Sequence, residues 1–273
     1  MFSLDSLHHL IIDMDGVLWQ GDTPLPGLRP FFDFLRRRAI RFILATNNAS
    51  QTPEQYVAKL ARMGVTVGRE EILTSAQAAA LYLAGVAPKG ATVYTIGELG
   101  LTQALTESGF NLTDGSAPYV VVGMDRGLSW EKLARATLNI RAGAMFIGTN
   151  PDVTLPTERG ITHGNGAVLA ALQAATGVQP VIVGKPEPIM YQQAMARLRG
   201  GRPLSPALEA GTDTAALGDR LETDILGAVR TGIRSILVLS GISKREQLKE
   251  LEYQPDWVFD SILELTTHWE AAL

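Results

Sequence analysis

The sequence contains no cysteine among its 273 residues. This absence excludes disulfide bonds, thiolate nucleophiles and cysteine-ligated zinc sites, and it fits a protein of the reducing cytosol. There is no excess of basic residues either: 24 lysines and arginines stand against 28 acidic residues, and the formal net charge is −4. Binding to a nucleic-acid backbone calls for a basic stripe. We therefore expect a small-molecule substrate and no nucleic-acid partner.

Long apolar runs are also missing. No segment approaches the roughly 18 uninterrupted apolar residues of a membrane-spanning helix, and the first residues show no basic stretch followed by a long apolar run. Internal repeats, low-complexity tracts and blocks of like charge are absent as well. Because 46% of the residues are hydrophobic and 19% are charged, the chain has ample material for a buried core. We expect a soluble, cytoplasmic protein with no membrane partner.

What the sequence does contain is an alternation of short apolar runs with longer periodic segments. This alternation is typical of βα units that build a mostly parallel sheet, so the predicted fold class is α/β. The length favours two domains, and the pattern breaks near Gly85 to Gly90 and near Gly184. The predicted strands are short and rich in apolar or β-branched residues, as buried parallel strands are: 9–12, 41–46, 92–96, 119–123, 144–148, 180–183, 214–218, 235–239 and 256–259.

Three predicted helices are marked by the residues at their starts. The helix over 53–63 begins with proline after Thr52, and the helix over 130–141 follows Ser129; these residue types are favoured at those places. The helix over 187–199 follows Lys185 and Pro186 directly, which puts the lysine on a strand-to-helix turn. Such turns are where open α/β sheets bind ligands. The four tryptophans are expected to fill cores or helix faces.

Two acidic residues, Asp13 and Asp15, follow the first predicted strand in the run LIIDMDGVL. Two carboxylates at one strand end would enter the same crevice, where they repel each other and resist desolvation. A divalent metal ion would relieve both effects. The motif therefore favours a functional site that depends on a divalent metal ion. The structural alternatives are a solvated acidic turn and a calcium site.

Three further strand ends carry polar residues, and each has a plain structural interpretation beside a functional one. Thr46 and Asn47 in RFILATNNAS offer hydrogen bonds to phosphate oxygens, but such residues also suit turns. Lys185 in VIVGKPEP could bind phosphate, although a lone lysine on a turn is more often a surface residue. In AALGDRLETDI, Asp219 ends a strand and Asp224 lies on the first turn of the next helix, where acidic side chains are favoured anyway.

Taken together, the four strand ends carry DxD, TN, K and GDxxxxD in chain order, and this set resembles the haloacid dehalogenase superfamily of phosphohydrolases. The likeness covers nearly the whole chain and is greatest to the branch of NagD-like and 4-nitrophenylphosphatase-like enzymes. It rests on the stretches DMDGVLWQGDTPLPG, TNNASQTPEQYVAKLARMG, GTNPD, GNGAVLAAL, GKPEPIMYQQA and GDRLETDILGA. The resemblance implies a doubly wound, Rossmann-like core over 1–79 and 184–273 with an inserted α/β cap domain of the C2 type over 80–183.

The resemblance also implies a role for each acidic residue. Asp13 would be the nucleophile, and Asp15 would be the general acid and base. Magnesium would be held by the Asp13 carboxylate, the Asp15 backbone carbonyl and Asp219, with Asp224 in support; oxygen ligands are what this ion prefers. Valine stands at position 17, where many superfamily members carry threonine, but valine is common in this branch.

Further residues are assigned by the same resemblance. Those expected to hold the phosphoryl oxygens are Thr46, Asn47 and Lys185. The cap of related enzymes reads the leaving group, which points here to Asn150, Asp152 and Leu155. A proline-stabilised loop in which Asp152 caps a turn explains that segment equally well. A homodimer through the cap is expected from the resemblance and the apolar strand YVVVG.

The predicted function is magnesium-dependent hydrolysis of small phosphorylated metabolites through an aspartyl-phosphate. Two alternatives stay open. A phosphotransferase or mutase would share every core motif. A phosphoacceptor receiver module would also combine aspartate, threonine and lysine, although it needs only about one small domain. Nucleotide binding of the P-loop type is disfavoured because no GxxxxGK[ST] occurs.

Overall fold

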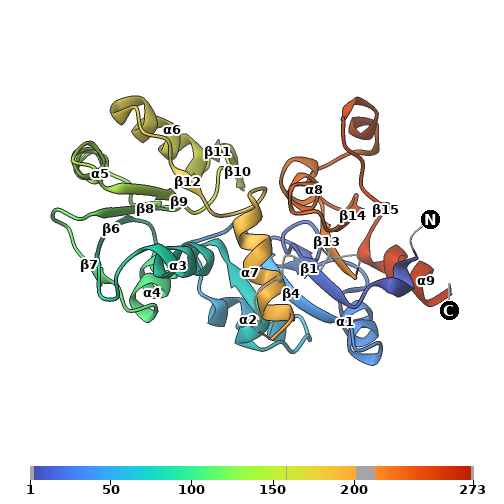
Figure 1. Ribbon diagram of the computed structural model, residues 1–273. Helices are drawn as coiled ribbons and strands as arrows, with labels where there is room; N and C mark the ends of the chain where they lie inside the picture. The colour runs from blue at the N-terminus through green and yellow to red at the C-terminus, as the bar shows by residue number, and fades with distance from the viewer. Residues whose placement is uncertain (1–2, 158, 201–212, 272–273) are drawn as a thin grey trace. The chain divides into compact units, whose positions relative to one another are not determined.

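The computed structural model of the chain (Figure 1) describes residues 3–157, 159–200 and 213–271. The chain forms two compact units. The first consists of Met1–Thr46, Val57–Leu73 and Pro186–Leu273, and the second of Asn47–Tyr56 and Thr74–Lys185. The second unit thus includes a short stretch, 47–56, in addition to the interval in which the cap is expected.

The described part of the first unit is built on a six-stranded sheet with the order β15-β14-β13-β1-β4-β5. β1 pairs in parallel with β4 on one side and with β13 on the other, and β13, β14 and β15 continue the parallel pairing. Because the chain winds outward from β1 in both directions, the sheet is doubly wound. The predicted fold class is confirmed. The strands are β1 (His9–Ile12), β4 (Arg41–Thr46), β5 (Ile72–Thr74), β13 (Thr214–Gly218), β14 (Arg234–Val238) and β15 (Trp257–Phe259).

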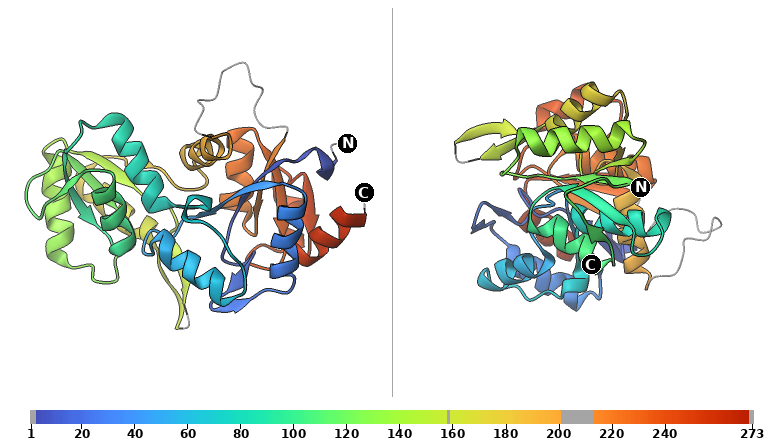
Figure 2. Two further views of the ribbon diagram at one scale, coloured as in Figure 1. Left: turned by 90° about the horizontal axis from the view of Figure 1, so that it is seen from below. Right: turned by 90° about the vertical axis from the view of Figure 1, so that its left-hand side faces the viewer.

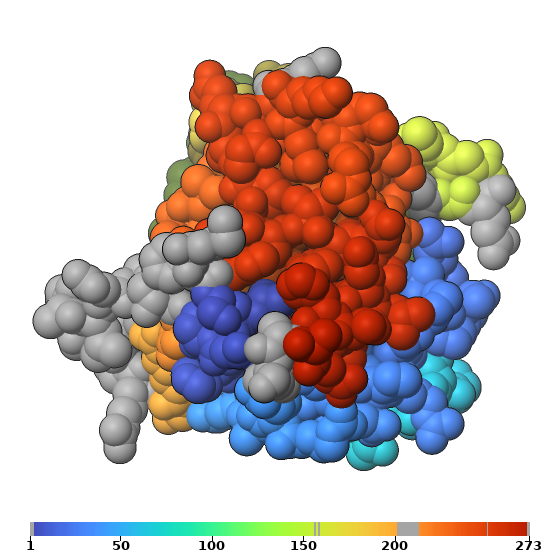
Figure 3. Space-filling model, turned by 90° about the vertical axis from the view of Figure 1, so that its right-hand side faces the viewer, coloured from blue at the N-terminus to red at the C-terminus, as the bar shows by residue number. Residues whose placement is uncertain are grey.

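Helices cover both faces of this sheet. In the left view of Figure 2, α7 and α8 lie on one side and α1 and α9 on the other. On the second side, the ring of Phe34 lies 5.3 Å from that of Trp269, measured between centroids. Figure 3 shows the α9 region in red at the surface, close to the dark-blue segment that contains η1. The helical elements are η1 (Leu4–Ser6), α1 (Leu28–Arg37), α2 (Pro53–Arg62), η2 (Arg69–Glu71), α7 (Pro188–Leu198), η3 (Leu221–Ile225), α8 (Leu226–Thr231), η4 (Arg245–Glu250) and α9 (Ile262–Ala271).

A short antiparallel hairpin follows β1. It consists of β2 (Trp19–Gln20) and β3 (Thr23–Pro24), with Trp19 opposite Pro24. Gly21 in its turn has a φ of +56°, a conformation that favours glycine because it has no Cβ. This hairpin is not among the elements predicted from the sequence.

The second unit has a parallel sheet and a core of its own. Its strand order is β12-β9-β8-β6-β7, and every pair is parallel. Side chains of β6, β8 and β9 and of α5 and α6 form one buried apolar cluster. The elements are α3 (Ser75–Val86), β6 (Thr92–Ile96), α4 (Leu99–Glu107), β7 (Asn111–Leu112), β8 (Tyr119–Val122), α5 (Trp130–Arg141), β9 (Met145–Gly148), α6 (Asn165–Thr176) and β12 (Val181–Ile182).

One correction concerns the segment after β9. Residues around Leu155 are predicted to form a loop, but they form an antiparallel hairpin of β10 (Thr154–Thr157) and β11 (Gly160–His163). Proline within a strand is confined to edges and bulges, so Pro156 obscured the strand. Among the strands of the described residues, β10 and β11 pair only with each other, which places this proline on an edge strand.

The predicted helix starts agree with the structure. The Ser129 side chain accepts a hydrogen bond from the Lys132 backbone N–H (3.2 Å) and caps α5. The Thr52 hydroxyl accepts one from the Gln55 N–H (3.4 Å) at the start of α2. Across the residues that the structure describes, none of the helices combines the length and the apolar character needed to cross a membrane.

Candidate active site

Three functional candidates of the first unit lie at one edge of its sheet. Asp13 follows β1, Thr46 is the last residue of β4, and Asp219 follows β13. These three strands are adjacent and parallel, so their carboxyl ends meet at the same edge. The backbone N–H of Asp13 donates to the Leu217 carbonyl (2.8 Å), which extends the β1–β13 ladder to the site.

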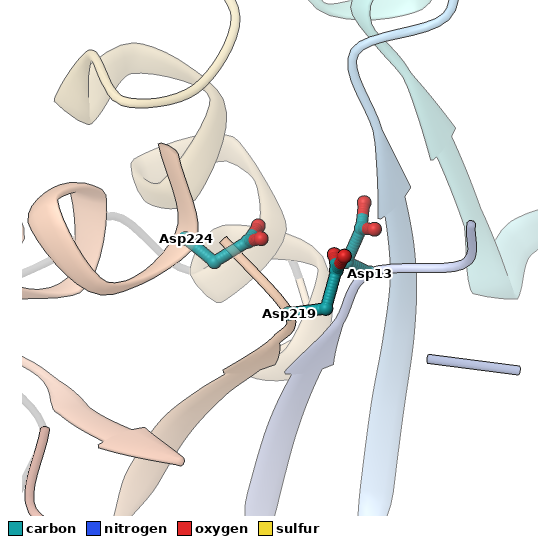
Figure 4. A group of neighbouring side chains, drawn as sticks. All are labelled: Asp13, Asp219 and Asp224. Carbon is teal, nitrogen blue, oxygen red and sulfur yellow. The ribbon is translucent and has the colours of Figure 1, made fainter. Parts of the chain in front are cut away.

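The side chains of Asp13, Asp219 and Asp224 converge at this edge (Figure 4). Each offers a carboxylate oxygen, and these oxygens all lie within 4.8 Å of one another. Asp219 and Asp224 are buried and Asp13 is half-buried. Such closely spaced carboxylates repel each other and are poorly solvated. Oxygen donors of this kind fit magnesium or calcium, so the cluster can hold a metal ion.

Backbone donors orient two of the three carboxylates. Asp219 Oδ2 accepts a hydrogen bond from the Ile242 N–H (2.7 Å). Asp224 Oδ2 accepts one from the Arg220 N–H (3.2 Å) and one from the Thr223 hydroxyl (3.4 Å). As predicted, Asp224 lies on the first turn of the helical segment after β13, which is the π-helical turn η3 that runs into α8. Turns of this kind are rare and occur frequently at functional sites.

Glycines allow the backbone to approach these carboxylates. A Cβ atom on Gly16 would lie 2.5 Å from Asp219 Oδ2, and Gly16 has a φ of +83°. Cβ atoms on Gly241 and Gly218 would overlap the side chains of Asp219 and Asp224, respectively. Bulk at these glycines would therefore displace the acidic residues.

We expect Gly16→Ala to weaken magnesium binding by about 10-fold or more, because the added methyl group pushes on the Asp219 carboxylate. The strained φ should also lower the free energy of unfolding by about 1 kcal/mol. Gly21→Ala is the matched control: its φ is also positive, but nothing lies within 4 Å of the added Cβ. Titration calorimetry with magnesium and denaturant unfolding separate the two effects. Equal magnesium affinity in both variants would contradict the expectation.

Asp15 lies next to the acidic cluster in sequence but has a different environment. Its side chain is exposed, and its Oδ1 accepts a hydrogen bond from the Trp19 indole N–H (2.8 Å). Trp19 is not among the predicted site residues, because the tryptophans are expected to fill cores or helix faces. Trp19 is indeed fully buried, but the polar end of its ring contacts a candidate catalytic residue. The available signal was its place four residues after Asp15.

In the second unit, the side chain of Asn47 binds the backbone of Lys185. Asn47 Oδ1 accepts from the Lys185 N–H (2.8 Å), and Asn47 Nδ2 donates to the Lys185 carbonyl (2.9 Å). A Cβ on Gly184 would lie 2.6 Å from Asn47 Oδ1, so glycine permits this approach. Lys185 is only 3% exposed. The alternative that it is a surface residue is therefore wrong.

Two of the cap candidates belong to the same network. Asn47 Nδ2 lies 3.3 Å from both carboxylate oxygens of Asp152. Asn150 Nδ2 donates to the Asn47 carbonyl (2.7 Å), and Asn150 Oδ1 accepts from the Asp152 N–H (3.1 Å). The Ser75 hydroxyl, which the sequence reasoning missed, also donates to the Asn47 carbonyl (2.6 Å). Leu155 lies on β10, and its backbone carbonyl accepts a hydrogen bond from the Thr162 hydroxyl (3.3 Å).

Comparison with known proteins places this arrangement in a class. A family model described as haloacid dehalogenase-like hydrolase matches residues 10–111, and a second, described as HAD-hydrolase-like, matches residues 182–265. Together these two stretches contain all the motif residues of the four strand ends: Asp13, Asp15, Thr46, Asn47, Lys185, Asp219 and Asp224. The chain belongs to the haloacid dehalogenase-like hydrolases.

Individual relatives match over nearly the whole chain. The acid sugar phosphatase of Staphylococcus saprophyticus is 38% identical over 261 residues, which cover 95% of this chain and 97% of that protein. The crystal structure of a 4-nitrophenylphosphatase from Thermotoga maritima is 32% identical, with a TM-score of 0.88 over 97% of this chain and 98% of the other. A glycerol phosphate phosphatase from Mycobacterium tuberculosis, in complex with magnesium, is 35% identical, with a TM-score of 0.86 over 97% of this chain and 79% of the other. The expectation of a phosphatase from this superfamily is confirmed.

Proposed function

We propose that the protein is a magnesium-dependent phosphomonoester hydrolase that acts on small phosphorylated metabolites through an aspartyl-phosphate. The observation that carries the proposal is the convergence of Asp13, Asp219 and Asp224 at the carboxyl edge of the sheet. A relative solved with magnesium and named a glycerol phosphate phosphatase supports the choice of metal and of substrate class. Acid sugar phosphatases among the relatives support the same class.

The acidic residues have separate tasks in this proposal. The Asp13 and Asp219 carboxylates and the Asp15 backbone carbonyl hold magnesium, and Asp224 supports the site. When bound, the ion offsets negative charge on the phosphoryl oxygens, a large contribution in phosphoryl transfer. The backbone donors to Asp219 and Asp224 keep these carboxylates oriented before the ion arrives.

The reaction proceeds in two displacements. A carboxylate oxygen of Asp13 attacks phosphorus in line, the bond to the leaving oxygen breaks, and Asp15 gives its proton to that oxygen. Asp13 then carries the phosphoryl group. In the second step Asp15 takes a proton from water as the water attacks phosphorus. The bond to Asp13 breaks, phosphate leaves, and Asp15 is protonated again.

Thr46, Asn47 and Lys185 hold the phosphoryl oxygens in this proposal. The Thr46 hydroxyl and the Lys185 ammonium are suitable donors. The side-chain amide of Asn47 is already bonded to Lys185 and Asp152. We therefore assign the phosphate contact of Asn47 to its backbone N–H, and we assign to its side chain the task of fixing the Lys185 backbone.

Substrate choice is assigned to the second unit. Asn150 and Asp152 bond to Asn47 and to each other, so they would act by setting the position of Asn47 and Lys185. Leu155 would act through apolar contact with the leaving group. The homodimer through the cap and the cytoplasmic location stay predictions.

The test is hydrolysis of a panel of phosphate monoesters. With magnesium, the purified protein should release phosphate from 4-nitrophenyl phosphate and from several sugar phosphates or glycerol phosphate. Chelation should lower the rate by roughly 10²-fold or more, and added magnesium should restore it. Undiminished hydrolysis after chelation would contradict the metal requirement. Transfer of the phosphoryl group to an added sugar or alcohol in place of water would favour the phosphotransferase alternative.

A further inference from the structure

The carboxylate of Asp15 has one side-chain partner among the residues that the structure describes, and that partner is Trp19. The indole Nε1 lies 2.8 Å from Asp15 Oδ1, a good distance for a hydrogen bond to a carboxyl group. Asp15 is exposed, whereas Trp19 has 0% of its surface accessible. An accessible carboxyl group is thus hydrogen-bonded to a fully buried ring.

The chain between the two residues forces this contact. After β1 it turns back on itself, with the Leu18 N–H bonded to the Met14 carbonyl (2.8 Å) and the Gly16 N–H bonded to the Trp19 carbonyl (2.8 Å). Asp15 and Trp19 are thereby paired as in a parallel bridge. Gly16, with its positive φ, permits the tight turn. The backbone conformation of residues 14–19 therefore places the two side chains next to each other.

Lys59 of α2 fixes the ring from its face. The Lys59 ammonium lies 4.6 Å from the centroid of the Trp19 ring, within the range of a cation–π interaction. The same ammonium donates to the Gly21 carbonyl (2.7 Å) in the turn of the hairpin. The ring and the hairpin that carries it are thus held together.

We infer that Trp19 is the positioning residue for Asp15, and that it determines which oxygen of Asp15 handles the proton. An indole N–H can only donate, so Asp15 Oδ1 must accept in both states of the carboxyl group. The proton that Asp15 gives to the leaving oxygen and later takes from water is therefore carried on Oδ2. This inference rests on the function proposed above, in which Asp15 is the general acid and base.

Burial alone does not explain the hydrogen bond. Trp269 of the same unit is also buried, at 1% exposure, and packs on Phe34. Its Nε1 has no hydrogen-bond partner within the described ranges of the chain. The fold therefore accommodates a buried tryptophan without using its N–H. Trp269→Phe is accordingly the matched control for Trp19→Phe, since both replace a buried indole by a phenyl ring.

The test compares the two chemical steps in these variants by rapid acid quench and mass spectrometry of the intact protein. Trp19→Phe should slow hydrolysis of the aspartyl-phosphate by about 10-fold or more, while the dissociation constant of the substrate stays within about 3-fold of the parent value. Formation of the intermediate from 4-nitrophenyl phosphate should change little, because 4-nitrophenolate leaves without a proton. Formation from glycerol phosphate should slow, because an alkoxide needs one. Phosphoenzyme should therefore accumulate with 4-nitrophenyl phosphate in Trp19→Phe and not in Trp269→Phe.

A double variant shows whether Trp19 acts through Asp15. If it does, adding Trp19→Phe to Asp15→Asn should cost no further activity, because the proton it positions is already gone. The magnesium affinity of Trp19→Phe, measured by calorimetry, should match that of the parent protein. Trp19→His keeps a ring N–H and should therefore recover part of the activity that Trp19→Phe loses. A parent-like Trp19→Phe protein would overturn the inference, and so would a loss that persists in the Asp15→Asn background. If Asp15→Asn itself turns over at the parent rate, the proposed function fails, and this inference fails with it.

Discussion

Asp13→Asn should abolish formation of the phosphoenzyme and lower turnover by about 10⁴- to 10⁶-fold, the range seen when a covalent nucleophile is removed. The amide is isosteric with the carboxyl group but is a far weaker nucleophile. It also carries no charge, so it weakens the cluster that Asp13 forms with Asp219 and Asp224. The measurement is acid quench after mixing with 4-nitrophenyl phosphate and magnesium. No phosphorylated protein should appear at any time.

The control for this variant is Asp33→Asn, which makes the same chemical change at an exposed position of α1. It should keep the parent rate and the parent level of phosphoenzyme. The Asp13→Asn protein should also unfold cooperatively, so that its inactivity is not a folding defect. A phosphorylated Asp13→Asn protein would show that another residue is the nucleophile.

Asp15→Asn should give the opposite pattern. The nucleophile remains, and the metal ligand proposed for this residue is its backbone carbonyl, so magnesium binding should persist. What disappears is proton transfer, which is typically worth about 10²- to 10⁴-fold in rate. With 4-nitrophenyl phosphate the first step needs no proton, so it should proceed. The second step needs a base, so the phosphoenzyme should accumulate and steady-state turnover should fall.

Rapid quench with two substrates separates these steps. Glycerol phosphate has a poor leaving group, so in Asp15→Asn it should form the intermediate slowly, unlike 4-nitrophenyl phosphate. The parent protein should show a much smaller difference between the two substrates. An Asp15→Asn protein that turns over at the parent rate, or that never becomes phosphorylated by 4-nitrophenyl phosphate, would contradict the assignment of acid and base.

The strands of both units could be predicted from the sequence because most of them are buried between helices. β1, β4, β6 and β13 occupy their predicted ranges, and the other five predicted strands are found with one or both ends shifted by a single residue. A strand that is covered on both faces has apolar side chains at nearly every position, and such a continuous apolar run is easily recognised in the sequence. The missed strands are two to four residues long. They are too short for periodicity to mark them.

The acidic cluster could be predicted for a related reason. The order of parallel strands brings their carboxyl ends together, so residues that follow different strands become neighbours. The network around Asn47 was not predicted, because the side chain of Asn150 contacts the Asn47 carbonyl across 103 positions of the chain. Trp19 was overlooked for another reason: its apolar ring explains its burial, and composition says nothing about where its N–H points.

The glycines beside the acidic cluster link the site to the stability of the chain. Glycine loses more conformational freedom on folding than any other residue, and Gly16, Gly218 and Gly241 are ordered against Asp219 and Asp224. Carboxylates crowded together at the same place oppose folding as well. A cation that binds the folded chain and not the unfolded one stabilises it in proportion to the logarithm of its concentration. The crowded site thus lowers the free energy of unfolding when the ion is absent, and magnesium binding raises it again. The concentration of free magnesium should therefore affect the stability of the folded chain as well as catalysis.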